Sequence, residues 1–211
     1  MKPDIQGIIF GQFWKMTNKF LEIYLKSFKE SLKTIKFDQL NRCVKILKDL
    51  RKSKGRLFII GVGGSAGNAS HAASDFRKLC NIDAYSPVDN ITEITAKTND
   101  EGFETVFDSY LKLSGLNQKD TLMVFSVGGG NLKKKVSVNL IKAIKYAKKK
   151  RSKVISIIGR KDGFAYKNSN AAILVNVNNK KFITPVTETF QVLVWHLLVT
   201  HPTLQINKTK W

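Results

Sequence analysis

The sequence has little cysteine, little proline and few acidic residues. Its 211 residues include 2 Cys, 4 Pro and 16 Asp or Glu, the last set against 36 Lys or Arg. Cys43 and Cys80 stand far apart and outside any CxxC spacing, which excludes a disulfide framework and a zinc finger. We therefore expect the reducing environment of the cytoplasm.

A long uninterrupted apolar run is also missing. No stretch of about 18 apolar residues, the length that crosses a membrane as a helix, occurs in the chain. The opening residues, MKPDIQGIIFGQFWKMTNKF, lack the apolar core and the small residues of a secretion signal. We therefore expect no membrane partner.

The scarcity of acid leaves a formal net charge of +20. Such a charge attracts anions, whether nucleic acid, lipid headgroups or phosphorylated metabolites. The lysines are spread along the whole chain without an aromatic platform on which bases could stack, which argues against nucleic acid as the partner. A hydrophobic share of 43% predicts a folded chain, and the length predicts one domain with a short appendage.

The N-terminal segment of the sequence has an amphipathic pattern. Apolar residues recur there at steps of three and four, the period of a helix with one wide apolar face. They are Phe10, Phe13, Trp14, Phe20, Leu21, Tyr24, Leu25, Phe28, Leu32 and Ile35. So many aromatic residues favour packing against another subunit, and we predict residues 1–36 to be a helical oligomerisation segment. The alternative, that this helix folds back on its own core, stays open.

Residues 37–211 have the pattern of an α/β domain. Short apolar runs, mostly β-branched, are typical of strands buried on both faces. They lie at 57–61, 121–126, 154–159 and 171–177. Helical patterns occupy 66–79 and 137–151, and a final helix begins near Thr184 and Pro185. This alternation predicts a doubly wound, mainly parallel sheet flanked by helices, with ligands beyond the carboxyl ends of the strands.

The first glycine-rich loop follows the first of these strands. Gly61, Gly63, Gly64 and Ser65 stand where backbone N–H groups and a hydroxyl can converge on an anion at a helix N-terminus. The same letters satisfy the dinucleotide fingerprint G-x-G-x-x-A, with Asp83 about 20 residues on. Asp83 does not end a clear strand, however, so we favour a phosphate. A tight turn without a ligand is the remaining alternative.

The second glycine-rich loop supplies further N–H donors at the same edge of the predicted sheet. Ser126, Gly128, Gly129 and Gly130 end the second strand, and Ser137 opens the next helix after a lysine-rich segment. Two such loops at adjacent strand ends indicate a phosphate cradle more strongly than either alone. Ser137 is also a residue type that caps helices, with or without a ligand.

Two histidines and two carboxylates are the candidate reactive groups. His71 and Asp75 stand four apart on the helix that opens at Ser65, so both point from one face. Glu188 and His196 repeat these residue types on the final helix. Eight residues of helix rise about 12 Å, which is too far for both to hold one atom on a straight helix.

Together these residues resemble the SIS (sugar isomerase) domain family, and within it the branch that acts on seven-carbon sugar phosphates. The matching segments are GVGGSAGNASHAASDF, DNITEITAKTNDEGFETVF, DTLMVFSVGGGN, VNLIKAIKYAKK, ISIIGRKDG and TETFQVLVWHLLV. They cover most of residues 40–200 in the family's order. The resemblance implies an α/β SIS domain over residues 37–211 and a homotetramer with sites at subunit boundaries.

The activity implied by this resemblance is an aldose–ketose isomerisation. It interconverts sedoheptulose 7-phosphate and D-glycero-D-manno-heptose 7-phosphate through an enediol, for the heptose of surface polysaccharides. By resemblance, Asp75 and His196 match the base and the acid. Zinc is bound in some members through positions that match His71, Asp75, Glu188 and His196.

The resemblance also implies substrate contacts along both loops and beyond them. Phosphate contacts match the serines, and backbone N–H contacts match the glycines of the two loops. Sugar-hydroxyl contacts match acidic and amide residues between the first and second predicted strands. These positions are Gly63, Gly64, Ser65, Asp89, Asn99, Asp100, Ser126, Gly128, Gly129 and Ser137.

The chain departs from the family at several of these positions. Val62 replaces an asparagine, Asp75 replaces a glutamate, and Glu188 replaces a glutamine and can take over as the base. A hydroxyl-rich second loop has become glycine followed by lysines at 133–135, which can restore phosphate affinity by charge.

A non-catalytic function is the second hypothesis that the resemblance allows. SIS domains also serve as sugar-phosphate sensors, and a relative associates with the bacterial replication initiator. Four ligand-type groups beside a phosphate loop favour catalysis, because a silent scaffold has no need of them.

Overall fold

The computed structural model describes residues 5–209 of the chain, with side chains from residue 14 onward. The strands are β1 (Arg56–Ile60), β2 (Asp83–Tyr85), β3 (Thr121–Ser126), β4 (Lys153–Ile158) and β5 (Ala171–Leu174). The α-helices are α1 (Ile5–Leu32), α2 (Phe37–Lys52), α3 (Gly64–Cys80), α4 (Ile91–Glu101), α5 (Val106–Leu113), α6 (Val138–Lys149), α7 (Phe164–Asn168) and α8 (Ile183–Val199). Short 3₁₀ turns are η1 (Pro87–Asp89), η2 (Phe103–Thr105) and η3 (Lys180–Phe182).

The strands form one parallel sheet in the order β2-β1-β3-β4-β5. Four of the strands lie where the apolar runs predicted them, and the doubly wound α/β fold is confirmed. The short strand β2 was not predicted. Asp83 is paired with Arg56 at the start of both strands. It therefore lies at the amino edge of the sheet, opposite the glycine-rich loops, where it cannot meet a dinucleotide ribose bound at those loops.

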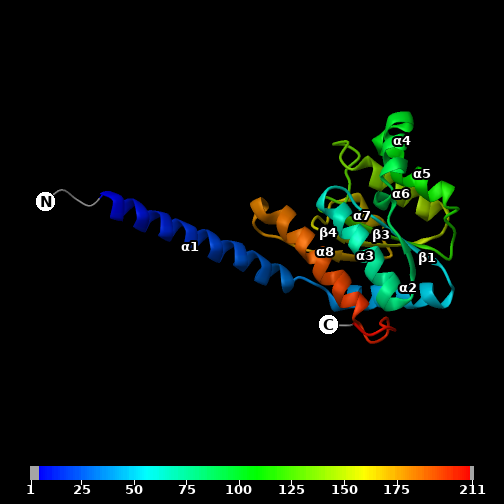
Figure 1. Ribbon diagram of the computed structural model, residues 1–211, viewed down its shortest axis with the longest axis horizontal. Helices are drawn as coiled ribbons and strands as arrows, with labels where there is room; N and C mark the ends of the chain where they lie inside the picture. The colour runs from blue at the N-terminus through cyan, green and yellow to red at the C-terminus, as the bar shows by residue number, and fades with distance from the viewer. Residues whose placement is uncertain (1–4, 210–211) are drawn as a thin grey trace.

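Helices cover both faces of the sheet (Figure 1). Buried residues of α2, α3 and α8 pack on one face, against side chains such as Ile59 and Phe125. Buried residues of α5, α6 and α7 pack on the other face, against neighbours such as Ile60 and Val124. Successive strand residues thus enter opposite cores, and this is why the strands are apolar throughout rather than alternating.

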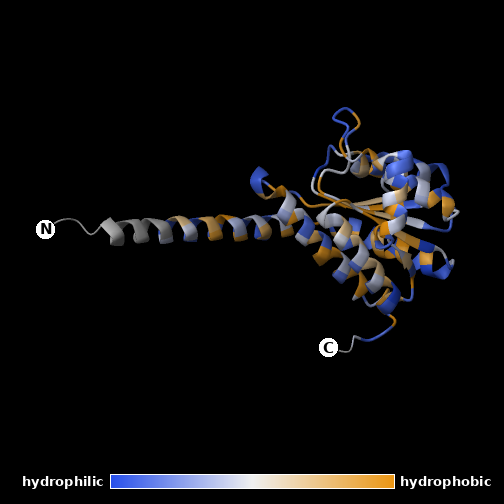
Figure 2. Ribbon diagram, turned by 45° about the horizontal axis from the view of Figure 1, so that its top comes forward, coloured by the Kyte–Doolittle hydropathy of each residue, from blue (hydrophilic) through white to orange (hydrophobic). Residues whose placement is uncertain are grey.

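Helix α1 projects away from this layered body (Figure 1). Near its C-terminal end, Tyr24 and Phe28 pack edge to face at 5.0 Å, and they contact the rings of Phe182 and Phe190. Further out, apolar residues continue along α1 (Figure 2). Several of their side chains, among them those of Trp14 and Leu25, are exposed to solvent. The side chains of Phe10 and Phe13 lie outside the described residues.

Helix α8 is the most apolar of the described helices that pack on the body. With η3 it forms a stretch, Lys180–Val199, that is long and apolar enough by composition to cross a membrane. Half of that stretch is buried inside the protein, and α8 packs against α3 and β3. Buried helices in the core of a globular protein commonly have this length and hydropathy. We therefore interpret α8 as a core helix.

Candidate active site

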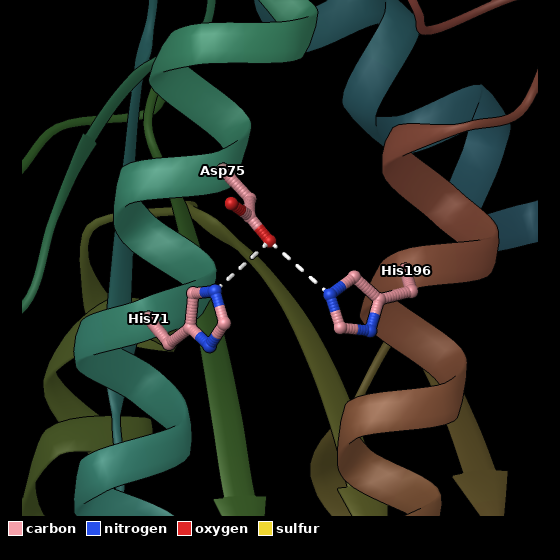
Figure 3. A group of neighbouring side chains, drawn as sticks. All are labelled: His71, Asp75 and His196. Atoms are coloured by element: carbon pink, nitrogen blue, oxygen red, sulfur yellow. Dashed lines mark ion pairs between the residues drawn. The ribbon is translucent and has the colours of Figure 1, made fainter. Parts of the chain in front are cut away.

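Three predicted residues meet between helices α3 and α8. Asp75 Oδ2 lies 3.6 Å from His71 Nε2 and 3.5 Å from His196 Nε2. Figure 3 shows the carboxylate between the two imidazoles, with His71 and Asp75 on α3 and His196 on α8. The cluster therefore joins two helices that are far apart in the sequence.

The local sequence explains how α3 and α8 come to share this cluster. His71 and Asp75 are one helical turn apart, so they project side by side from α3. The opposite side of α3 buries Ala69 and Ala73, and Ala72 is buried beside the cluster; their small side chains allow close packing in the core. Helix α8 packs alongside α3 and presents His196 to the same spot.

The cluster is open on one side and closed on the other. The side chains of His71 and His196 are 59% and 48% exposed, whereas that of Asp75 is 14% exposed. Behind the carboxylate lies the buried Trp195, whose indole N–H donates a hydrogen bond to Asp75 Oδ2 at 3.1 Å. A small molecule or an ion can thus approach the histidine side only.

This donor set suits a metal ion of the zinc type. Two imidazole nitrogens and one carboxylate oxygen lie within 4.8 Å of one another. Tetrahedral zinc with ligands at 2.0–2.1 Å places those ligands about 3.3 Å apart, close to the separations seen here. Three protein ligands with an open side are the arrangement of a catalytic rather than a structural zinc site.

Glu188, the fourth predicted ligand, is not part of this group of three. Its carboxylate lies against Gly64 at the first turn of α3, where a Cβ on Gly64 would come 2.5 Å from Glu188 Oε2. A side chain at position 64 would therefore displace the Glu188 carboxylate. The rise of about 12 Å along α8 accounts for this separation of Glu188 from His196.

The hydroxyl of Ser65 faces the interior. Ser65 is 1% exposed and accepts a hydrogen bond from Gln191 Nε2 at 3.0 Å. Asn68 donates in turn to Gln191 Oε1 at 2.8 Å and to the backbone carbonyl of Glu188 at 3.0 Å. This network joins the N-terminal part of α3 to the middle of α8. A substrate contact made by the side chain of Ser65 stays a prediction.

Sequence reasoning missed three residues of this region, namely Asn68, Gln191 and Trp195. On α8, Glu188, Gln191 and Trp195 are spaced by three and four, so they share one helical face. This shared face within an apolar helix is the signal in the sequence that could have indicated Gln191 and Trp195.

The second loop is tightly held by its own backbone. Ser126 is 6% exposed, and its hydroxyl accepts a hydrogen bond from the N–H of Gly129 at 3.0 Å. Gly129 and Gly130 have positive φ values of 70° and 81°, which favour glycine. The loop can therefore present backbone N–H groups while Ser126 stabilises its turn.

The lysine-rich segment forms a small antiparallel hairpin. Asn131 and Val136 exchange two backbone hydrogen bonds of 2.9 and 3.0 Å. Ser137 follows in a left-handed conformation, with φ 49°, and makes no side-chain cap to α6. The prediction that Ser137 caps this helix is therefore wrong, because the hairpin turns its backbone away from the extended conformation that a cap requires.

A cavity of about 630 Å³ opens between the first loop, η2, the hairpin and the start of α6. Its polar lining includes Lys135, Ser137 and Lys142, and its apolar lining includes Val62 and Phe103. Lys142 Nζ lies 3.8 Å from Oε1 of Glu104, which also lines the cavity. Lys135 reaches the cavity from the hairpin. The cavity is large enough for a metabolite, and its two lysines favour an anionic group.

The remaining predicted sugar contacts lie on the surface of the other layer. Asp89 ends η1, and Asn99 and Asp100 lie near the end of α4, all of them exposed. Asn99 donates to Asp100 Oδ1 at 2.8 Å. No described contact joins these three side chains to the histidine cluster, so their contact with substrate stays a prediction.

Comparison with known proteins agrees with this fold. The model of the SIS domain family matches residues 23–159. The lincomycin biosynthesis protein LmbN of Streptomyces lincolnensis is 31% identical over 167 residues, which are 76% of this chain and only 60% of LmbN. Phosphoheptose isomerase of Helicobacter pylori strain P12 is 29% identical over 178 residues, which are 82% of this chain and 86% of that protein.

A solved structure extends the comparison to the tertiary level. The phosphoheptose isomerase GmhA from Neisseria gonorrhoeae superposes with a TM-score of 0.74 at 22% identity. The match covers 89% of this chain and 97% of that chain. At this identity the likeness establishes a shared fold.

Proposed function

The chain belongs to the SIS domain family, and from this premise we propose that it is a phosphosugar aldose–ketose isomerase. The proposed reaction interconverts sedoheptulose 7-phosphate and D-glycero-D-manno-heptose 7-phosphate, in the cytoplasm, for the heptose of surface polysaccharides. The observation that carries the proposal is the meeting of Asp75, His71 and His196 on the open side of two packed helices.

The reaction needs a base for the carbon-bound proton and an acid for the oxygens. Asp75 can take the proton from one of C1 and C2 and return it to the other, through an enediol. His196, 3.5 Å from Asp75 and half exposed, can exchange a proton with the adjacent oxygens. Both groups therefore face the same open side, as one substrate requires.

The two histidines and Asp75 are the residues that would hold zinc. Bound there, zinc would polarise the sugar oxygens as a Lewis acid. Glu188, beside Gly64, is the second carboxylate near the site and the alternative base.

In this proposal, the phosphoryl group of the substrate binds in the cavity lined by Lys135, Ser137 and Lys142. The ammonium group of Lys135 and the hydroxyl of Ser137 can contact a phosphoryl group there, while Lys142 is shared with Glu104. This group binds without reacting, so its role is to orient the carbon chain.

The test is direct turnover. Purified full-length protein is mixed with sedoheptulose 7-phosphate, with and without added zinc, and the aldose product is followed by chromatography. We expect the aldose to accumulate to equilibrium. An inert preparation that still binds the sugar phosphate would contradict the isomerase and favour a sensor module.

A further inference from the structure

We propose that Trp195 is a positioning residue of the site, whose indole N–H holds Asp75 in the orientation that both histidines require. The inference rests on the proposed function and deepens it. It begins with one hydrogen bond, in which Trp195 Nε1 donates to Asp75 Oδ2 at 3.1 Å. That same oxygen faces His71 and His196.

The indole is itself rigidly held. Trp195 is 1% exposed and stacks on Phe125, with ring centroids 6.0 Å apart and planes inclined by 17°. Its ring also lies 5.4 Å from that of His71 and 5.0 Å from that of His196. Trp195 thus touches every member of the cluster and is anchored to the central strand β3.

The hydrogen bond constrains both partners. An indole has a single polar atom, a donor, and a buried indole N–H that finds no acceptor carries a desolvation cost. Asp75 supplies that acceptor. In return, the fixed N–H selects one position for a carboxylate whose terminal torsion otherwise varies broadly.

This constraint matters more for aspartate than for a longer side chain. Asp75 reaches the cluster from α3 through one methylene group, so small rotations of its carboxylate move Oδ2 away from the imidazoles of α8. A misplacement of about 1 Å costs on the order of a hundredfold in rate. Partners that orient metal ligands typically contribute about 10- to 100-fold in metal affinity or activity.

The first test uses zinc itself as the probe. Zinc affinity of the metal-stripped, full-length protein is measured by competition with a chromogenic chelator, for the unchanged chain, Trp195→Phe and Phe190→Leu. Phenylalanine keeps an aromatic ring in the core and removes the N–H. Phe190 is buried on the same helix, and its ring packs against Phe28; among the described contacts none joins it to the cluster, so Phe190→Leu reports general damage to the core.

We expect Trp195→Phe to weaken zinc binding about 10-fold or more, while Phe190→Leu leaves it unchanged despite a lowered Tm. With sedoheptulose 7-phosphate, Trp195→Phe should lower kcat and leave KM close to its original value. Zinc affinity that is equal in Trp195→Phe and the unchanged chain would overturn the proposal.

A second measurement does not depend on the folding of Trp195→Phe. Hydrogen exchange of the Trp195 indole N–H is followed by NMR in protein with ¹⁵N-labelled tryptophan. Asp75→Ala should speed this exchange about 10-fold or more, and His71→Ala, which removes a neighbouring ring but no acceptor, should not. Equal exchange in both variants would overturn the hydrogen bond and with it the proposal.

These readouts separate the inference from the proposed function. Zinc affinity and indole exchange need no turnover, so they can support the role of Trp195 even if no sugar phosphate is isomerised. Conversely, isomerisation with unchanged zinc affinity in Trp195→Phe would support the enzyme and overturn the role of Trp195.

Discussion

At the scale of single residues, the proposed chemistry centres on one oxygen atom. Asp75 Oδ2 faces two imidazoles and an indole N–H, whereas the carboxylate of Glu188 lies beside Gly64. Two carboxylates in different surroundings can serve different roles. The geometry favours Asp75 for proton transfer at the histidine side.

Exchange of each carboxylate for its amide tests that assignment. Asp75→Asn should lower kcat by about 10²- to 10⁴-fold, the usual weight of a general base. Glu188→Gln should cost less than about tenfold, because its carboxylate is outside the histidine cluster. Steady-state kinetics on sedoheptulose 7-phosphate measure both, and a larger loss in Glu188→Gln would transfer the role of base to Glu188.

The two cysteines have no part in this chemistry. Burial raises the pKa of Cys43 to about 12 and that of Cys80 to about 12. A raised pKa keeps a thiol protonated at pH 8, and the thiolate is the reactive form. We expect native protein to react very slowly with a thiol-specific disulfide reagent, and guanidinium-unfolded protein to react at both sites. Fast labelling of the native protein would contradict this burial.

At the scale of elements, the hairpin between β3 and α6 is the lysine-rich part of the proposed phosphate site. It carries lysines at 133–135 and projects Lys135 to the cavity that Ser137 and Lys142 also line. The ammonium group of a lysine on this hairpin can attract a phosphoryl group by its charge, without a fixed hydrogen-bond geometry.

Removal of one charge at a time tests the hairpin. Lys135→Ala should raise KM for the sugar phosphate about tenfold, which corresponds to roughly 1.4 kcal/mol for a charged hydrogen bond. Lys133→Ala is the matched control, since Lys133 belongs to the same hairpin but does not line this cavity. An equal effect of both substitutions would indicate general attraction by charge instead of a specific contact.

At the scale of the whole molecule, helix α1 is too apolar to remain uncovered. Trp14, Phe20 and Leu25 are 51%, 54% and 65% exposed. An exposed apolar stripe of this kind marks an interaction surface, and the long helix projects from the body where a second copy can pack against it. We therefore predict a homo-oligomer, with a tetramer as the expected form.

The assembly can be measured by light scattering coupled to size-exclusion chromatography. The unchanged chain should exceed its monomer mass of 23.8 kDa severalfold. Leu25→Glu should shift the population toward smaller species, because it places a charge in the apolar surface. Lys19→Glu introduces a glutamate at an exposed polar position of the same helix and should leave the mass unchanged. A monomeric unchanged chain would contradict the prediction.

Local patterns predicted much of this architecture. The apolar runs located four strands, because strands buried on both faces must be apolar at every position. The spacing of His71 and Asp75 placed them on one helical face. The strand β2 escaped prediction because Asp83–Tyr85 is short and exposes two of its three residues.

By itself, therefore, the sequence determined the α/β alternation, the two glycine-rich strand ends and the local pairing of His71 with Asp75, since each depends on near neighbours along the backbone. The resemblance predicted both His196 and Glu188 beside that pair, and only the tertiary structure decided that His196 joins it and that Glu188 lies apart. The tertiary structure also brought Trp195 to Asp75 across 120 residues of chain. Contacts of that range depend on how two helices pack on a sheet, and neither periodicity nor residue type specifies that packing.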